Sequence, residues 1–165
     1  MILWRDMSAM MLAAALAACS GQSVEQQAAT PEPSAAAAET HPMSGLAIIP
    51  VTVTTDDGSH SFRTEVADTL ESQQRGMMFR TEMGADEAML FPYDEPDIRS
   101  FWMRNTVLPL DIIFIDEDGE IINIADGVPY NEVSVMSDRE AIAVLELNGG
   151  RAEELGIEAG DRVTW

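Results

Sequence analysis

The chain contains no lysine and only one cysteine, Cys19, among its 165 residues. A single cysteine excludes an internal disulfide and a cluster of thiolate ligands around a metal ion. Because Cys19 lies ahead of the predicted folded region, that region also has no cysteine nucleophile.

Histidine is nearly as scarce, with His41 and His60 the only two in the chain. Neither has a partner at the spacing of a metal-ligand pair, and there is no Gly-x-Ser-x-Gly elbow or Ser–His–Asp pattern. The sequence therefore predicts no metal site and no cofactor, and it favours a protein that is not an enzyme.

Basic residues are few: 9 stand against 29 acidic ones, which gives a net charge of −20 at pH 7. The acidic residues are spread along the chain, which is typical of a solvated surface, although a face that attracts cations would have the same composition. A body of this charge repels nucleic acid and anionic membrane surfaces, so neither is an expected partner.

The apolar run over residues 7–18 is too short to span a bilayer as a permanent helix. It follows Arg5 and ends in Leu16-Ala-Ala-Cys19, which resembles the lipobox of bacterial lipoproteins. This pattern predicts a lipoprotein signal peptide over residues 1–18, with Cys19 as the lipidated N-terminus that anchors the protein to the membrane. An ordinary secretory signal or a short anchor, with a cysteine there by chance, is the alternative. Ser20 resembles the outer-membrane sorting pattern, which predicts the periplasmic face of the outer membrane in the bacterial cell envelope.

Residues 19–45 are rich in alanine, glutamine, glutamate and proline, with almost no large apolar side chain. Such a segment cannot offset the entropy lost on ordering, so it is predicted to be a flexible tether.

Residues 46–165 are predicted to form a single β-domain, because short apolar and β-branched runs alternate with turn signals. Short helices are expected over 69–75, with Asp68 as its cap and Glu71 three residues later, and over 151–155. Seven or eight short strands without strand–helix alternation predict a mainly β fold, a compact jelly-roll-like sandwich or small barrel. The expected strands cover residues 51–55, 61–66, 88–91, 98–104, 110–116, 120–124, 141–147 and 161–165.

The segment 99–116 places charged side chains within predicted β-structure. Its strand over 110–116 is apolar on both faces and is therefore expected to be central, with Asp111 at its start. A carboxylate there has to be solvated at the rim of the sheet, or paired with Arg104 or with backbone N–H groups. The simplest interpretation is that Asp111 closes the loop over residues 104–109.

Arginines concentrate in the same region, with Arg75, Arg80, Arg99 and Arg104 inside residues 75–104. Guanidinium groups suit bidentate binding of carboxylate or phosphate, so their convergence predicts an anion site, and separate salt bridges to local acids are the alternative. Trp102 is expected either in the core or in a pocket where its ring stacks on a ligand. The predicted ligand-binding rim consists of Arg75, Arg80, Trp102, Arg104, Asn105, Thr106 and Asp111.

Several segments resemble, in order, the family called domain of unknown function 192, over residues 50–165. They are Arg75-Gly-Met-Met-Phe-Arg, Ala88-Met-Leu-Phe, Ser100-Phe-Trp-Met-Arg-Asn-Thr, Pro109-Leu-Asp-Ile-Ile-Phe-Ile-Asp and Val144-Leu-Glu-Leu-Asn-Gly-Gly. Ala88 replaces a usual glycine and Arg104 a usual lysine. The resemblance implies a compact, mainly β fold of the jelly-roll or barrel kind, often exported or envelope-attached. It brings no established activity, so no catalytic residue is carried over.

The leading hypothesis is an envelope-anchored lipoprotein that acts as a non-enzymatic binding or accessory module. Its ligand would be a small polar or anionic molecule, or an envelope protein partner. The alternative is a hydrolase or lyase acting on an envelope polymer. Asp111 or Glu146 would then be the general acid or base, and an arginine would stabilise developing negative charge.

Overall fold

The computed structural model describes residues 39–165. The predicted signal peptide over residues 1–18, the predicted lipidation site Cys19 and residues 20–38 of the predicted tether lie outside the described residues. The described part is mainly β, as predicted, with nine strands and two short helices. In chain order these are β1 (Ile48–Thr55), β2 (Gly58–Val66), α1 (Leu70–Arg75), β3 (Glu87–Asp97), β4 (Ser100–Phe101), β5 (Leu110–Ile115), β6 (Ile121–Gly127), β7 (Val135–Met136), β8 (Ala141–Asn148), α2 (Arg151–Leu155) and β9 (Arg162–Thr164).

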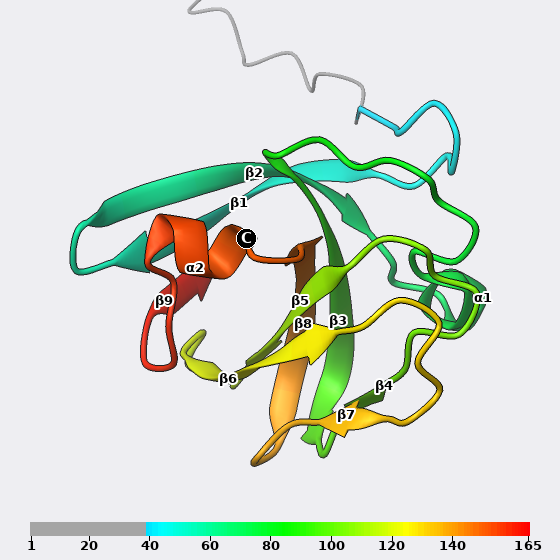
Figure 1. The fold of residues 1–165 in the computed structure, drawn as a ribbon. Coiled ribbons are helices and arrows are strands. Elements are labelled where there is room, and N and C mark those ends of the chain that lie inside the picture. Colours follow the sequence, from blue (N-terminus) through cyan, green and yellow to red (C-terminus); the bar gives the residue numbers. More distant parts are fainter. Residues whose placement is uncertain (1–38) are drawn as a thin grey trace, which may run out of the picture. The chain divides into compact units, whose positions relative to one another are not determined.

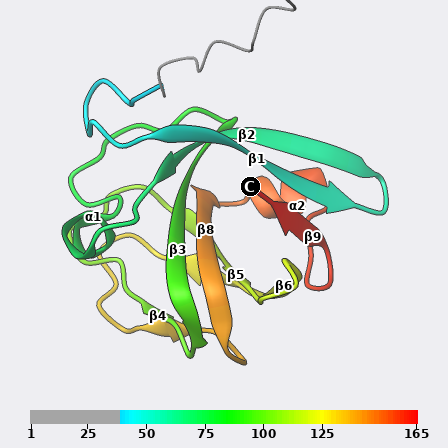
Figure 2. The ribbon, with the colours of Figure 1, turned by 180° about the vertical axis from the view of Figure 1, so that it is seen from behind.

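Seven of the strands form one mixed sheet in the order β6-β5-β8-β3-β2-β1-β9, and β4 pairs separately with β7. Figure 1 and Figure 2 show the long strands crossing the middle of the domain, with α1 at one end and α2 and β9 at the other. The two helices therefore lie at opposite ends of the domain (Figure 1, Figure 2).

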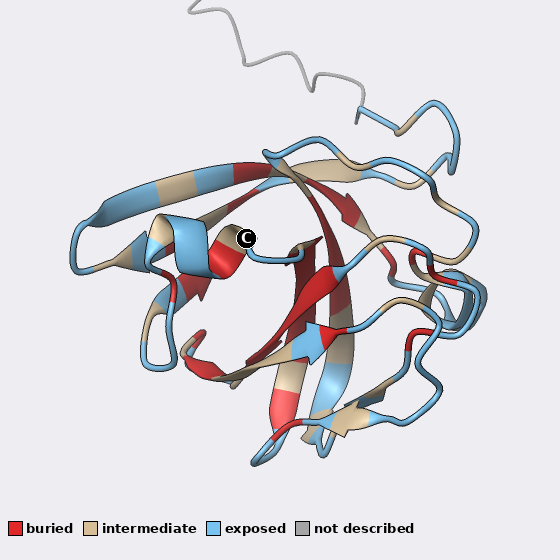
Figure 3. Cartoon of the chain, in the orientation of Figure 1, coloured by how far each residue is buried: buried red, intermediate tan, exposed pale blue. Residues whose placement is uncertain are grey.

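The interior strand β5 is buried along its whole length, because both of its faces are covered. Ile113 and Ile115 pack into one hydrophobic core together with Leu145 of β8. Ile112 and Phe114 point the other way, into a second core. Figure 3 shows buried residues along β5 and along the neighbouring parts of β3 and β8. The prediction of a central strand that is apolar on both faces is confirmed.

The sheet curls without closing into a barrel. Its outer strands β6 and β9 share no continuous ladder. The turn before β6 contacts β9 through the Val163 N–H, which donates to the Gly119 carbonyl at 2.7 Å, and through one bridge between Glu120 and Arg162. The expected small barrel is thus an open, curled sheet.

The predicted strand over residues 98–104 is wrong, because only Ser100 and Phe101 belong to a strand. The chain turns directly afterwards: the Thr106 N–H donates to the Met103 carbonyl at 3.1 Å. Asn105 has a φ of 56°, a left-handed conformation that no strand adopts. These residues form a loop instead. The partner of β4, the two-residue strand β7, was not predicted.

Strand β3 continues past Pro92, where the sequence predicts its end. Proline lacks an N–H donor, but the pairing of β3 with β8 is irregular between Pro92 and Asp97, so the ladder tolerates it there. The Pro92 carbonyl accepts a hydrogen bond from Gln73 Nε2 at 2.9 Å, which attaches α1 to the sheet.

The pairing of β2 with β3 is parallel, with Arg63 opposite Glu87 and Val66 opposite Leu90. Parallel neighbours require a crossover connection, and α1 lies in it. The sequence shows no strand–helix alternation because this crossover occurs once and its helix is short. The crossover comprises residues 67–86 and lies at the end of the domain that holds the candidate site (Figure 1).

Gly119 allows a test of the contact between the turn before β6 and β9. Its φ is +78°, and a Cβ atom there would lie 2.7 Å from the Val163 carbonyl oxygen. We expect Gly119→Ala to lower the free energy of unfolding by about 2–4 kcal/mol in urea titrations, because left-handed strain and the clash add. The control is Gly150→Ala, with a φ of +83° and no atom within 4 Å. It should cost only about 1–2 kcal/mol. Equal losses in the two variants would contradict the contact.

Candidate functional site

The candidate site begins at α1. Its N-cap is Thr69: the Thr69 hydroxyl accepts from the Ser72 N–H at 3.1 Å, and the Ser72 hydroxyl accepts from the Thr69 N–H at 3.0 Å. The predicted cap at Asp68, with Glu71 as its partner, is therefore shifted by one residue. Capping uses Ser72 and leaves the Glu71 side chain available for another role.

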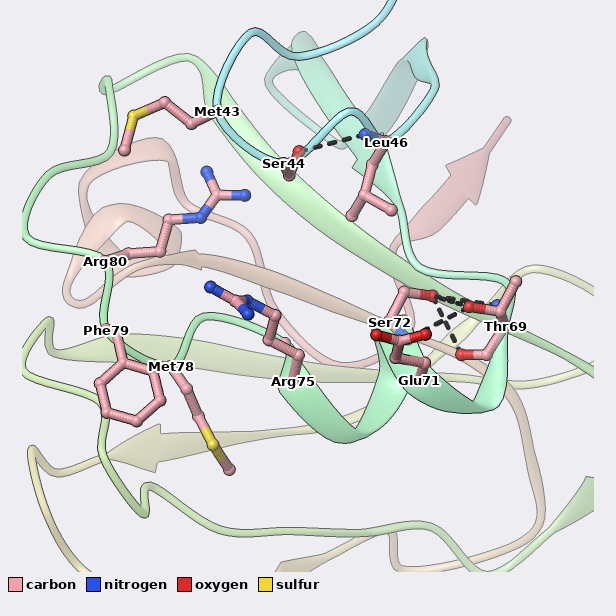
Figure 4. A pocket seen from close by; sticks show the side chains of 11 residues that line it. Met43, Ser44, Leu46, Thr69, Glu71, Ser72, Arg75, Met78, Phe79 and Arg80 are labelled. Atoms are coloured by element: carbon pink, nitrogen blue, oxygen red, sulfur yellow. Dashed lines mark hydrogen bonds between the residues drawn. The ribbon is translucent and has the colours of Figure 1, made fainter.

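A pocket of about 450 Å³ lies between α1, the turn over residues 43–46 and the loop over residues 76–80 (Figure 4). This volume is within the range of about 300–1,000 Å³ that small-molecule sites occupy. Apolar and polar side chains both line it, so it suits a ligand of mixed character. The lining residues are Met43, Leu46, Met78, Phe79, Ser44, Thr69, Glu71, Ser72, Arg75, Gly76 and Arg80.

Arg80 is fixed in the pocket wall by Glu65 of β2. Its Nη1 and Nη2 atoms donate to the two Glu65 carboxylate oxygens at 2.7 and 2.6 Å, and the Ser44 hydroxyl donates to the same carboxylate. Burial alone would raise the pKa of the Glu65 carboxyl, but the hydrogen bonds from Arg80 and Ser44 outweigh it and hold the pKa below its ordinary value. Arg80 is therefore a neutralised part of the wall, but its partner is Glu65 of β2, 15 positions away, and not one of the acids beside it in the sequence.

Arg75 is the second cation of the pocket, and its side chain has no partner among the described residues. Within residues 39–165 its side chain makes no ion pair and no hydrogen bond. Figure 4 shows its guanidinium directed into the pocket beside that of Arg80. In this part of the chain every other arginine except Arg104 contacts a carboxylate or a backbone carbonyl oxygen.

Three loops, over residues 76–80, 102–107 and 128–134, meet beside α1; we call this region the three-loop end (Figure 1). Each loop holds one residue in the left-handed conformation, Phe79 (φ 64°), Asn105 (φ 56°) and Tyr130 (φ 61°). The Phe79 N–H donates to the Asn105 carbonyl at 2.9 Å, and the Tyr130 N–H donates to the Thr106 carbonyl at 3.1 Å. Left-handed residues other than glycine cost about 1–2 kcal/mol each and persist only where neighbours hold them. The hydrogen bonds between the loops provide that support.

Trp102 and Arg104 lie on the surface of the three-loop end. The Trp102 side chain is 44% exposed, and the Arg104 guanidinium lies 5.4 Å from the centroid of its ring. The core position considered for Trp102 is therefore wrong. Thr106 is buried, and its hydroxyl donates to the Arg104 carbonyl at 3.3 Å, so it shapes the loop from within. Exposed apolar side chains concentrate here: Phe79, Trp102, Val107, Val128, Tyr130 and Val133.

A family model covers most of this architecture: DUF192, described as an uncharacterized ACR, matches residues 51–165. The chain belongs to the DUF192 family. Two motifs of its DUF192 domain, over residues 75–80 and 100–106, form one edge of the pocket and the adjoining loop, which the Phe79–Asn105 hydrogen bond joins. The opposite edge, the turn over residues 43–46, precedes the matched region.

Two solved structures resemble this DUF192 protein. A protein of unknown function from Novosphingobium aromaticivorans DSM 12444 is 53% identical, with a TM-score of 0.76 over 79% of this chain and 94% of that one. A candidate transcription regulator from Sinorhizobium meliloti 1021 is 37% identical, with a TM-score of 0.70 over 72% of this chain and 94% of that one. No curated protein is significantly similar to the chain.

Asp111 does not join the other predicted rim residues of the DUF192 domain. Its Oδ1 accepts from the Gly150 N–H at 2.8 Å and its Oδ2 from the Ala152 N–H at 2.7 Å. Asp111 thus caps α2 from a neighbouring strand, because Gly150 at the N-cap has no side chain to do so. Pairing with backbone N–H groups was one of the predicted outcomes. The expected partner Arg104 and the expected closure of the loop over 104–109 are wrong.

Glu146, the second carboxylate considered for catalysis, is buried in β8 between Met89 of β3 and Ile112 of β5. Its Oε2 atom is buried without a hydrogen-bond partner among the described residues. Burial in this apolar setting raises the pKa of the Glu146 carboxyl from 4.5 to about 8. Glu146 does not line the pocket, so a polymer bound there would not reach it.

Sequence reasoning placed Arg75 and Arg80 in the candidate site but missed the residues that complete the pocket. The sequence predicts Glu71 as a partner in helix capping and places Met43 and Ser44 in the tether. It contains Phe79 only as part of a motif. The one available signal was the four-residue spacing of Glu71 and Arg75, which puts both on one face of a helix.

Two further properties concern residues 39–165 alone. No group of three or more His, Cys, Asp or Glu side chains in this range is placed to hold a metal ion. No helix in the same range has the length and apolar character needed to span a membrane.

Substitution of Asp111 tests its role as the cap of α2. We expect Asp111→Ala to lower the free energy of unfolding by about 2–3 kcal/mol, because two buried N–H groups lose a charged acceptor. Arg104→Ala should change it by no more than about 0.5 kcal/mol, since that side chain is exposed and does not contact Asp111. Urea titration of the two variants measures both values. An equal loss of unfolding free energy in Arg104→Ala and Asp111→Ala would instead support a pairing of Arg104 with Asp111.

The buried acid Glu146 predicts a pH-dependent stability. A carboxyl whose pKa is raised by folding stabilises the fold fully below its unfolded pKa and loses that contribution as the pH rises through the folded pKa. The window is therefore pH 4.5 to about 8. Relative to wild type, Glu146→Gln should become more stable across this window, by at most about 5 kcal/mol at roughly 1.36 kcal/mol per pKa unit. The control Glu117→Gln, in an exposed turn, should follow the wild-type curve. Parallel curves for Glu146→Gln and wild type would show that Glu146 is ionised in the fold.

Proposed function

We propose that this DUF192 protein is a non-enzymatic binding module of the bacterial cell envelope, anchored by lipid at Cys19. Its ligand is a small molecule with an anionic group, held in the pocket beside α1. The envelope location rests on the sequence of residues 1–20, and the binding role rests on the geometry of the pocket.

The observation that carries the binding role is the state of Arg75. A guanidinium that has no carboxylate partner in the described part of the chain, directed into a pocket of about 450 Å³, is ready to bind a carboxylate or phosphate in a bidentate manner. Arg80 beside it is already neutralised by Glu65, so Arg75 provides the charge that attracts the ligand. The apolar side chains of Met43, Met78 and Phe79 would contact the rest of the molecule.

The positions of the two candidate carboxylates favour binding over catalysis. Both Asp111 oxygens accept backbone N–H groups at the start of α2. Glu146 is enclosed by the sheet. Neither of these two lines the pocket, and Glu71, which does, has no second carboxylate among the described lining residues to share the acid and base roles.

The three-loop end supports a second candidate function, contact with a protein partner. Its exposed apolar side chains lie close together on an otherwise acidic protein. Exposed apolar patches of this kind mark sites of protein–protein contact. Since the chain carries a net charge of −20, the partner would be a protein of net positive charge.

A ligand panel tests the pocket. Sugar acids, sugar phosphates, aliphatic carboxylates, amino acids and peptidoglycan fragments are added to the full-length protein and thermal unfolding is followed. A ligand at one hundred times its dissociation constant stabilises the native state by about 2.7 kcal/mol, which gives a clear rise in melting temperature. We expect at least one compound to stabilise wild type and Arg104→Gln but not Arg75→Gln.

Arg104→Gln is the matched control, because Arg104 is also exposed and without an ion pair in the described region but does not line the pocket. A panel without any stabilising compound would contradict the proposed function. So would stabilisation that survives Arg75→Gln unchanged.

A further inference from the structure

Glu71 lies one turn before Arg75 on α1, and both side chains line the pocket. A glutamate followed four residues later by an arginine is the orientation that favours an ion pair along a helix. The two side chains form no such pair. Figure 4 shows the Arg75 guanidinium extended away from Glu71, toward Arg80 and the pocket.

Helix capping does not occupy Glu71 either. Thr69 and Ser72 satisfy each other's N–H groups, and Ser72 holds the third helical position, where a capping glutamate would act, one residue after Glu71. Across the part of the chain that the structure describes, the Glu71 carboxylate makes no hydrogen bond and no ion pair. The pocket therefore holds one uncommitted anion and one uncommitted cation.

We propose, building on the anion site at Arg75, that the ligand is a zwitterion, an α-amino acid with an apolar side chain. Its carboxylate binds the Arg75 guanidinium and its ammonium group binds the Glu71 carboxylate. Its side chain packs against Met78 and Phe79.

The spacing of the two charges supports this assignment. Residues four apart on a helix have Cβ atoms about 5–6 Å apart, so a compact ligand that bears both charges can contact both side chains. Each contact would be a charge-assisted hydrogen bond.

The charge of the whole protein supports it as well. A zwitterion has no net charge, so the −20 of the chain does not repel it, whereas a polyanion would be repelled. A ligand with an anionic group alone would leave its body beside the unneutralised Glu71 carboxylate. An amine without a carboxylate would meet Arg75.

Isothermal titration of the full-length protein tests the proposal with L-phenylalanine, L-methionine and L-leucine as probes. For the amino acid that binds best, two analogues each remove one charge: the compound without the amino group, such as 3-phenylpropionate, and the carboxamide, such as L-phenylalaninamide. We expect each analogue to bind at least about tenfold more weakly than the parent amino acid, because each loses one hydrogen bond between charged groups.

Variants of the protein provide the complementary measurement. Glu71→Gln and Arg75→Gln should each weaken amino-acid binding by about tenfold or more. The matched control is Glu153→Gln, an acidic residue in the first turn of α2, which should leave the dissociation constant unchanged. Because Glu71 and Arg75 are exposed and neither side chain forms a hydrogen bond or ion pair within residues 39–165, both variants should keep the wild-type melting temperature.

The outcomes separate the two proposals. If the analogue without the amino group binds as tightly as its parent, and Glu71→Gln has no effect while Arg75→Gln abolishes binding, the zwitterion is wrong and the anion site stands. If the amino acids do not bind while other anions bind through Arg75, the zwitterion is again wrong and the anion site again stands. If no compound binds in a manner that depends on Arg75, both proposals are wrong.

Discussion

Burial of β5 on both faces is the constraint on which the rest of this structure depends. Ile113 and Ile115 fill one core while Ile112 and Phe114 fill the other, so helices, loops and outer strands have to cover both sides of the sheet. Burial of a large aliphatic or aromatic side chain contributes roughly 1.5–3 kcal/mol to the free energy of unfolding. These buried strands therefore contribute much of the stability of the domain. Polar side chains that enter this region must find partners, as Asp111 does, or remain protonated, as the raised pKa of Glu146 implies.

The two ends of the domain, one at α2 and one at α1, differ in what holds them together (Figure 1). At α2 the Asp111 carboxylate completes the hydrogen bonding of a short helix that its own sequence cannot cap. At α1 three loops hold one another through backbone hydrogen bonds, with Phe79, Asn105 and Tyr130 in left-handed conformations. Conformations of this cost are characteristic of binding sites, where the surrounding structure fixes side chains before a ligand arrives. The first end therefore serves stability, and the second supplies the candidate site.

Electrostatics divides the arginines of that second end into two kinds. Arg80 is held by a buried carboxylate in bidentate geometry, and removing either partner would leave an unpaired charge in the wall of the pocket. Arg75 differs in that its charge faces the pocket without a partner among residues 39–165. A fold that contained only Arg80 would have a stable but neutral wall. The combination provides both a rigid wall and an attractive charge, which is what recognition of a small polar ligand requires.

The sequence by itself determined the mainly β class, the double-sided burial of β5 and the helix at Arg151–Leu155. Each of these follows from a pattern that repeats within a few residues, so local periodicity is sufficient. Only the tertiary structure decided which groups pair. Asp111 binds N–H groups about forty positions away in place of nearby Arg104, Thr69 and Ser72 release Glu71 into the pocket, and Arg80 but not Arg75 finds a buried carboxylate. Such choices depend on which distant elements the sheet brings together, because a charged side chain pairs with what lies near it in space, and the local pattern of residues does not contain that information.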